Sequence, residues 1–257
     1  MIKKITLIGS GNVAHNLGKA FILNGFDVVE VYSRTKANAK ALAEKLDAKS
    51  TNNLSEINKE SDLYIIATTD NAIEKIVEKL DFKGHFVVHT SGSVSIDVFE
   101  NSFSHFGSFY PLQTFTKSHQ ADFKEIPICV EGNNEKNLEL LKGLANKLSN
   151  KVNKVVELSS AQRQKLHLSA VFVSNFANYM QVIGEDLCEE QQVDFELLKP
   201  LIKEVFHKNQ KGKAINNQTG PALRGASFTM NKHLELLKDK KELHQLYELL
   251  SGMIQNK

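Results

Sequence analysis

The sequence predicts a doubly wound, mostly parallel α/β sheet in its N-terminal part, followed by an all-helical C-terminal part. Short apolar runs alternate with segments of helical periodicity up to about residue 157, as in parallel sheets whose strands are joined by helices. A glycine-rich turn follows the first apolar run. Beyond residue 158 only helical periodicity is found. We therefore predict an α/β domain over residues 1–157 and an all-helical domain over residues 158–257.

The α/β part begins with an apolar run that ends in glycine, and further strand and helix signals follow in alternation. The expected strands are residues 4–9, 27–32, 62–68, 85–90, 105–109, 126–131 and 152–157. The expected helices are residues 12–24, 36–46, 72–80, 95–99 and 135–148. Asn71 and Glu74 have the spacing of a capping box, which predicts the start of the third helix.

The helical part contains three expected helices. The first covers residues 159–190, and Ser159 with Gln162 forms a capping box at its start. The second covers residues 195–211 and has Pro200 in its first turns, an awkward place for proline. A loop follows, and the last helix covers residues 243–254.

Composition excludes several classes of protein. Hydrophobic residues make up 41% and charged residues 24%, as in ordinary globular proteins, and no segment reaches the ~20 apolar residues of a membrane span. A net charge of +2 gives no broad attraction to nucleic acid or to an anionic membrane. Cys129 and Cys188 form neither a disulfide framework nor a zinc spacing, so no metal site is predicted. The first apolar run is too short for a signal peptide, and we expect a cytoplasmic protein.

A dinucleotide-binding fingerprint, G-x-G-x-x-A, lies between the first strand and the first helix. Gly9 permits the tight turn, Gly11 lets the backbone approach a pyrophosphate, and Ala14 permits close packing of helix and strand. The helix N-terminus favours the anion. A glycine turn that binds nothing is the alternative, but the position favours a Rossmann nucleotide site. Its predicted contacts are Gly9, Ser10, Gly11, Asn12 and Val13.

The end of the second strand favours NADP over NAD. NAD enzymes usually have an acidic residue there, whereas this chain has Ser33 and Arg34, and Glu30 lies too early, inside the strand. A serine and an arginine bind a 2′-phosphate that a carboxylate would repel. The alternative is that Arg34 is only a solvated surface residue. NADP(H) is therefore the expected cofactor, with Ser33, Arg34, Thr35, Thr68 and Thr69 as further contacts; Asp70, beside them, is better interpreted as a helix cap.

Candidate chemical groups follow other strand ends, because ligands of open α/β sheets lie beyond the carboxyl ends of the strands. His89 and Ser91 suit a site that hydrogen-bonds a carbonyl or carboxylate, although a histidine satisfied by a turn carbonyl is an equal alternative. Tyr110 and Gln113 flank Pro111, which ends the strand, and are placed to face the cleft.

The helical part supplies further candidates. Lys165, if buried, would have a lowered pKa and could protonate a carbonyl as a hydride arrives; the alternative is a solvated lysine. His167, Ser174 and Asn178 share one helix face by their spacing of seven and eleven residues. Arg224, in a rigid Gly-Pro turn, could clamp a carboxylate or phosphate, or it could pair with helix carbonyls.

Six segments together resemble the Rossmann-plus-helical-domain proteins named NADP oxidoreductase, coenzyme F420-dependent. These are distant relatives of pyrroline-5-carboxylate reductase, ketopantoate reductase and the β-hydroxyacid dehydrogenases. The segments are residues 9–13, 32–35, 89–92, 110–115, 165–167 with 174–175, and 219–225. The resemblance implies NADP use and a homodimer formed through the helical domains. Tyr110 and Ala226 depart from the family's pattern, which often has histidine and aspartate there.

The first interpretation is an NADP(H)-dependent oxidoreductase that transfers a hydride to or from a small carbonyl or imine bound between the two domains. The catalytic candidates are Lys165, His167, His89 and Ser91, and the substrate-binding candidates are Tyr110, Gln113, Ser174, Asn175 and Arg224. The second interpretation is a non-catalytic NADP(H)-binding sensor, which would need no proton donor. Nucleic-acid binding is disfavoured, because the sequence has no basic stripe and no aromatic platform.

Overall fold

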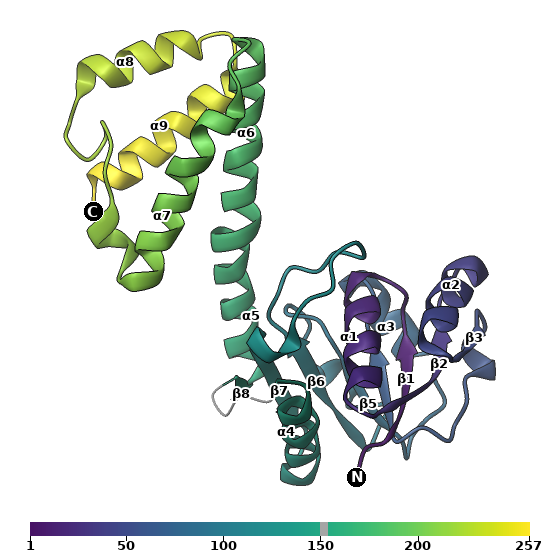
Figure 1. Ribbon diagram of the computed structural model, residues 1–257. Coiled ribbons are helices and arrows are strands. Elements are labelled where there is room, and N and C mark those ends of the chain that lie inside the picture. Colours follow the sequence, from purple (N-terminus) through teal and green to yellow (C-terminus); the bar gives the residue numbers. More distant parts are fainter. Residues whose placement is uncertain (150–153) are drawn as a thin grey trace. The chain divides into compact units, whose positions relative to one another are not determined.

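The computed structural model describes residues 1–149 and 154–257, and it contains one sheet and a series of helices (Figure 1). The strands are β1 (Lys4–Ile8), β2 (Asp27–Tyr32), β3 (Lys49–Thr51), β4 (Leu63–Ile66), β5 (Phe86–His89), β6 (His105–Pro111), β7 (Ile128–Gly132) and β8 (Val155–Glu157). The α-helices are α1 (Asn12–Leu23), α2 (Lys36–Leu46), α3 (Asp70–Val77), α4 (Glu135–Ser149), α5 (Ser160–Ala170), α6 (Ala177–Glu190), α7 (Lys199–Lys211), α8 (Ser227–Leu236) and α9 (Lys241–Gln255).

The sheet has the order β3-β2-β1-β4-β5-β6-β7-β8. All neighbouring strands are parallel except β6 and β7, which pair antiparallel. This confirms the doubly wound, mostly parallel sheet. The strand order reverses between β1 and β4, and the carboxyl ends of these strands flank the switch point where ligands of open α/β sheets bind.

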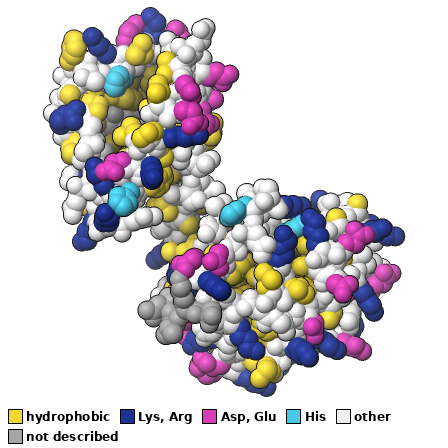
Figure 2. Space-filling view, in the orientation of Figure 1, with side chains coloured by type: hydrophobic (Ala, Val, Ile, Leu, Met, Phe, Trp, Pro, Cys, Tyr) yellow, Lys and Arg dark blue, Asp and Glu magenta, His cyan; other side chains and the backbone are white. Residues whose placement is uncertain are grey.

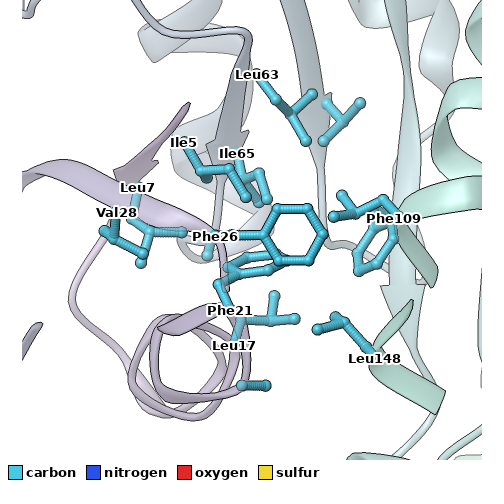
Figure 3. Close-up of a cluster of buried hydrophobic side chains, with 14 of the residues drawn as sticks. Ile5, Leu7, Leu17, Phe21, Phe26, Val28, Leu63, Ile65, Phe109 and Leu148 are labelled. Atoms are coloured by element: carbon cyan, nitrogen blue, oxygen red, sulfur yellow. The ribbon is translucent and has the colours of Figure 1, made fainter. Parts of the chain in front are cut away.

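Hydrophobic side chains fill both faces of the sheet. Helices α1, α2 and α4 cover one face, and α3 with the short 3₁₀ helix η2 (Ile96–Phe99) covers the other. In the close-up of the first face, Phe21 and Phe26 lie near Ile65 and Phe109 (Figure 3); the rings of Phe21 and Phe26 meet edge to face at 5.9 Å. Burying each of these side chains contributes about 1.5–3 kcal/mol.

Of the two predicted capping boxes, one is present and the other is not. The Oγ atom of Ser159 accepts a hydrogen bond from the backbone N–H of Gln162, and Gln162 Oε1 accepts one from the Ser159 N–H, so the predicted capping box is present. The box predicted from Asn71 and Glu74 is wrong, because α3 begins at Asp70 with Thr69 as its N-cap residue. Asp70, interpreted above as a cap, is instead the first residue of α3, where its carboxylate stabilises the helix through the helix dipole.

Other differences from the expected elements have local causes. The short strand β3 and the helix α8 were not predicted. The long helix expected over residues 159–190 contains a π-helical segment, η4 (Val171–Phe176), between α5 and α6. Pro200 lies at the start of α7, where a missing N–H costs no helix hydrogen bond. Of the strand expected over residues 152–157, positions 152 and 153 lie outside the described residues.

The chain divides into two compact units, Met1–Tyr179 and Met180–Lys257. The boundary predicted at residue 157/158 marks the change from α/β to helical structure, and as a domain boundary it stays a prediction. Within the second unit only Ala222 and Ser251 are buried. Hydrophobic side chains gather on the face of this unit seen in Figure 2. Both cysteines are free, and among the described residues no helix is long and apolar enough to cross a membrane.

Candidate functional site

A cavity of about 570 Å³ opens at the carboxyl ends of β1, β2 and β4. All ten residues predicted to contact a cofactor line it: Gly9, Ser10, Gly11, Asn12, Val13, Ser33, Arg34, Thr35, Thr68 and Thr69. The β1–α1 turn, the β2–α2 turn and the β4–α3 turn supply them. Residues far apart in the sequence therefore meet at the switch point of the sheet, as the fingerprint predicts.

Gly9 and Gly11 of the fingerprint are required to be glycine for different structural reasons. Gly9 has a φ angle of +135°, and a Cβ atom there would lie 2.1 Å from the carbonyl oxygen of Ala67. Only glycine therefore fits between β1 and β4. A Cβ atom on Gly11 would meet nothing within 4 Å, so this glycine leaves open space beside the backbone at the cavity, where a pyrophosphate can approach.

The start of α1 is suited to an anion. Gly11 is the N-cap residue, no side chain caps the helix, and no acidic residue lies in its first turn. The free N–H groups and the helix dipole favour a phosphate there. Ser10 Oγ donates a hydrogen bond of 2.9 Å to Ser33 Oγ, which joins the phosphate turn to the end of β2. Glu30 points elsewhere, because its carboxylate accepts a hydrogen bond from the Asn58 N–H.

Two lysines that the sequence analysis missed also line the cavity. Lys75 and Lys79 of the α3 region lie on the same side as Ala72 and Ile76, which line it too. The signal for them is present in the sequence, since two lysines four residues apart follow the strand end at Thr68. It becomes specific only when the cavity shows which face of the helix the ligand meets.

A second group of side chains lies where β6 ends. The hydroxyl of Tyr110 and Nδ1 of His167 are 2.9 Å apart, and the two rings meet edge to face at 5.9 Å. A Cβ atom on Gly92 would lie 2.6 Å from the His167 ring. Gly92 therefore lets the imidazole pack against the turn after β5. The structure brings three predicted segments together here: residues 89–92, Tyr110 and the start of the long helix.

Burial dominates the electrostatics of Tyr110. The residue is only 9% exposed, and burial raises the pKa of its hydroxyl to about 12, with a smaller contribution from Cys129 on the paired strand. The phenol is therefore protonated at neutral pH and can donate a proton or a hydrogen bond. His167 is half-buried, so the pair joins a buried hydroxyl to a more exposed imidazole.

Arg163 holds this group in place, and the sequence analysis missed it. Its side chain is 1% exposed, and it forms an ion pair with Glu131 of β7. It also donates to the carbonyl oxygens of Ser91 at 3.1 Å and Val94 at 2.6 Å. Arg163 thus fixes the turn after β5 to the helix that carries His167. No local motif predicts this, because the partners lie on β7 and in the turn after β5, far from Arg163 in sequence.

His89 and Ser91 make structural contacts in this arrangement, and the catalytic roles predicted for them stay predictions. His89 is fully buried and stacks on Phe99; burial, and then the charge of Arg163, lowers the pKa of its imidazole to about 3. Its Nδ1 accepts a hydrogen bond from the Ser91 N–H. Ser91 Oγ accepts two more, from the N–H groups of Ser93 and Val94, and so shapes the turn.

The remaining candidates lie in less constrained places. Lys165 is exposed, and its role as a proton donor stays a prediction. Gln113 is exposed, with its Oε1 accepting from the Thr114 N–H. Arg224 is exposed in the second compact unit, in a turn where Gly220 and Gly225 have positive φ angles. Its role as an anion clamp stays a prediction.

The π-helical segment alters the predicted helix face. Ser174 and Asn175 lie inside η4, where Ser174 is half-buried and Asn175 is exposed. A π-helix bonds i to i+5 rather than to i+4. The α-helical spacing that placed His167, Ser174 and Asn178 on one face therefore does not continue through this segment. Such segments are frequent at functional sites, and this one directly follows the helix that carries His167.

Comparison with families of known proteins matches both parts of the chain. Residues 4–92 match the family described as NADP oxidoreductase, coenzyme F420-dependent. Residues 126–254 match a domain of unknown function, DUF2520. No curated protein matches the chain.

Solved structures extend the comparison to the whole chain. A candidate NADP oxidoreductase from Bacteroides fragilis is 39% identical, with a TM-score of 0.91 and coverage of 100% of this chain and 99% of the other. A protein from Thermotoga maritima is 21% identical, with a TM-score of 0.73 and coverage of 98% and 97%. An imine reductase from Myxococcus stipitatus, solved with NADP⁺, is 16% identical, with a TM-score of 0.67 and coverage of 98% and 93%. The last two show a shared fold.

Proposed function

We propose that this chain transfers a hydride to or from a small carbonyl or imine. It belongs to a family in which a domain described as NADP oxidoreductase, coenzyme F420-dependent, is joined to a DUF2520 domain. NADP is the cofactor. The observation that carries the proposal is the cavity at the switch point. It combines an uncapped helix N-terminus with Ser33 and Arg34 at the end of β2.

The cavity residues fit NADP(H) at both of its anionic groups. The open backbone at Gly11 and the start of α1 suit the pyrophosphate. Arg34 suits the 2′-phosphate, because a guanidinium binds phosphate through paired hydrogen bonds. When bound, the cofactor supplies or accepts the hydride at its nicotinamide ring. The protein has to orient the substrate and move the proton.

Tyr110 and His167 are the groups best arranged to move that proton. The carboxyl ends of β4, β5 and β6 lie at one edge of the sheet, since these strands are parallel, so Tyr110 shares this edge with the cofactor cavity. Its hydroxyl is protonated at neutral pH and gives its proton to the substrate oxygen or nitrogen during reduction. His167, hydrogen-bonded to that hydroxyl, orients it and connects it to solvent.

The remaining assignments complete the proposal. Gln113, Ser174, Asn175 and Arg224 are substrate-binding candidates, and the active form is a homodimer formed through the helical domain. Support for the homodimer comes from the second unit, where exposed apolar side chains greatly outnumber buried residues. Large exposed apolar patches of this kind mark interfaces.

Titration with NADPH and NADH tests the proposal directly. We expect Arg34→Ala to weaken NADPH binding at least about tenfold, which corresponds to about 1.4 kcal/mol, and to leave NADH binding nearly unchanged. Lys40→Ala is the control, since Lys40 lies on α2, pairs with Glu44 and does not line the cavity. Equal losses for both nucleotides would contradict recognition of the 2′-phosphate by Arg34.

Turnover separates the enzyme from the sensor. We expect the protein to oxidise NADPH with at least one member of a panel of small carbonyls and cyclic imines, and we expect Tyr110→Phe to abolish this turnover while leaving NADPH binding intact. Tight NADPH binding without turnover across the panel would favour a non-catalytic NADP(H)-binding protein.

A further inference from the structure

We infer that the 2′-phosphate of NADP(H) is held from two sides, by Arg34 at the end of β2 and by Lys75 and Lys79 of the α3 region. The inference rests on the proposed NADP(H) binding and deepens it, because it names the residues that make the site selective for the phosphorylated nucleotide. The two lysines would then determine cofactor specificity together with Arg34.

The first support is the face that α3 presents to the cavity. The lining residues from this segment are Ala72, Lys75, Ile76 and Lys79, which are spaced three and four residues apart, as one helix face requires. Ala72 and Ile76 line the cavity with apolar side chains, and so does Leu54, which is distant in sequence. The lysines lie on the same face as Ala72 and Ile76, so a nucleotide base packed there would bring its ribose close to their ammonium groups.

The second support is the charge of the cavity. Among the described residues, the cations that line it are Arg34, Lys75 and Lys79, and no described aspartate or glutamate lines it. Glu74 and Glu78 alternate with the lysines along the chain but do not line the cavity. In the described parts of the chain none of the three cations forms an ion pair, whereas Lys40 and Lys59 do.

The third support is the energetics of three unpaired cations that share one cavity. Like charges repel, and a dianion bound among them relieves this repulsion and gains charge-assisted hydrogen bonds. The arginine offers a rigid planar fork and each lysine a mobile point charge, so the three can surround a phosphate without identical geometry. The pyrophosphate has its own site at the start of α1, which leaves these side chains for the 2′-phosphate.

The test compares four proteins, all full length: the wild type, Lys75→Met, Lys79→Met and the double variant. Methionine keeps the apolar stem of lysine and removes its charge. We expect each single variant to raise the Kd for NADPH about fivefold and the double variant at least about twentyfold, as for loss of charge-assisted contacts. The Kd for NADH should stay within about twofold. Lys83→Met is the matched control, because Lys83 is exposed and outside the cavity.

A small probe isolates the subsite. Adenosine 2′,5′-bisphosphate should displace NADPH from the wild type and lose this ability in the double variant, whereas 5′-AMP should compete equally weakly with both. The NADPH affinity of the double variant should also depend less on salt, because fewer charges are neutralised on binding.

Three outcomes would overturn the inference. An equal loss of NADH affinity would assign the lysines to the pyrophosphate. Unchanged NADPH affinity in the double variant would show that Arg34 acts alone, while the proposed function would stand. A wild type that binds neither nucleotide would overturn the proposed function as well, so the two failures are distinguishable. Unfolding temperatures equal to that of Lys83→Met would show that the variants are folded.

Discussion

His89 lies at the carboxyl end of β5 with its imidazole buried against Phe99. Its Nδ1 accepts from the Ser91 N–H, and Nε2 has no hydrogen-bond partner among the described residues. The hydroxyl of Ser108, which lies opposite His89 on β6, is also buried and has no hydrogen-bond partner within the described part of the chain. Burial and the charge of Arg163 outweigh the backbone groups of Ser95 and His89 that favour a positive charge, so the pKa of the imidazole is lowered and the neutral form is favoured.

This burial makes His89 a source of acid sensitivity. Its pKa of about 3 lies below the ordinary 6.5, so between these values the unfolded chain binds a proton that the folded chain does not. The stability that the neutral His89 imidazole contributes is therefore fully present above pH 6.5 and is lost as the pH falls toward 3. In His89→Asn, which can keep an acceptor for Ser91, we expect the free energy of unfolding to fall less steeply between pH 6 and 4, by about 1 kcal/mol per pH unit.

Urea unfolding at several pH values measures this slope. His119→Asn is the control for the loss of one imidazole, since His119 is exposed in the loop after β6. A slope for His89→Asn equal to that of the wild type would show that His89 titrates alike in both states, and would contradict the buried neutral imidazole.

Single residues also show which part of the candidate site the sequence could reveal. The fingerprint residues are neighbours in the chain, and their roles follow from backbone geometry at Gly9 and Gly11. Tyr110 and His167 are 57 residues apart, and no local rule states that they meet. Both were identified as candidates, but the hydrogen bond that gives them a joint role depends on how α5 packs against β6 and β7.

Among the elements, α5 depends most on one buried contact. Arg163 connects it to Glu131 of β7 and to the turn after β5. A buried ion pair of this kind is costly to break, because the remaining charge loses its partner in a low-dielectric environment. The position of His167 therefore depends on Arg163, although among the described residues Arg163 makes no hydrogen bond to the Tyr110 hydroxyl.

A double-mutant cycle measures this contact. We expect Arg163→Met and Glu131→Gln each to lower the free energy of unfolding by about 3–5 kcal/mol, and the double variant to lose less than the sum, because the second change removes a charge that is already unpaired. Lys142→Met is the control, since half-buried Lys142 pairs with two exposed carboxylates, Glu139 and Glu157, and its loss should cost far less. Additive losses would show that Arg163 and Glu131 act independently.

The elements that the sequence predicted well are those with a strong local signal. The box at Ser159 and Gln162 fixed the start of α5, because both of its hydrogen bonds lie within four residues. The three-residue strand β3 exists through its pairing with β2, and its own sequence carries no alternation to detect. The segment η4 (Val171–Phe176) was not predicted, because it lies inside a longer helix and is distinguished by i to i+5 hydrogen bonds.

At the scale of the whole molecule, the two compact units differ in how they bury apolar surface. The first has two hydrophobic clusters, one on each face of its sheet. In the second, the exposed apolar side chains include Leu201 and Val205 on α7 and Phe228 on α8. Single domains need a buried core to offset the entropy of folding. We therefore expect the second unit to need another apolar surface, and the proposed homodimer would supply it from a second copy of the chain.

Sedimentation velocity tests this view of the second unit. We expect the wild type to sediment at twice the 28.8 kDa mass of the chain, because interfaces of stable homodimers are large and apolar. Leu201→Asp together with Val205→Asp places two charges one turn apart on the exposed face of α7, and we expect it to give a monomer. Lys203→Asp introduces an acidic residue between them in sequence but on another face, and should leave the dimer intact. A monomeric wild type at micromolar concentration would contradict the homodimer.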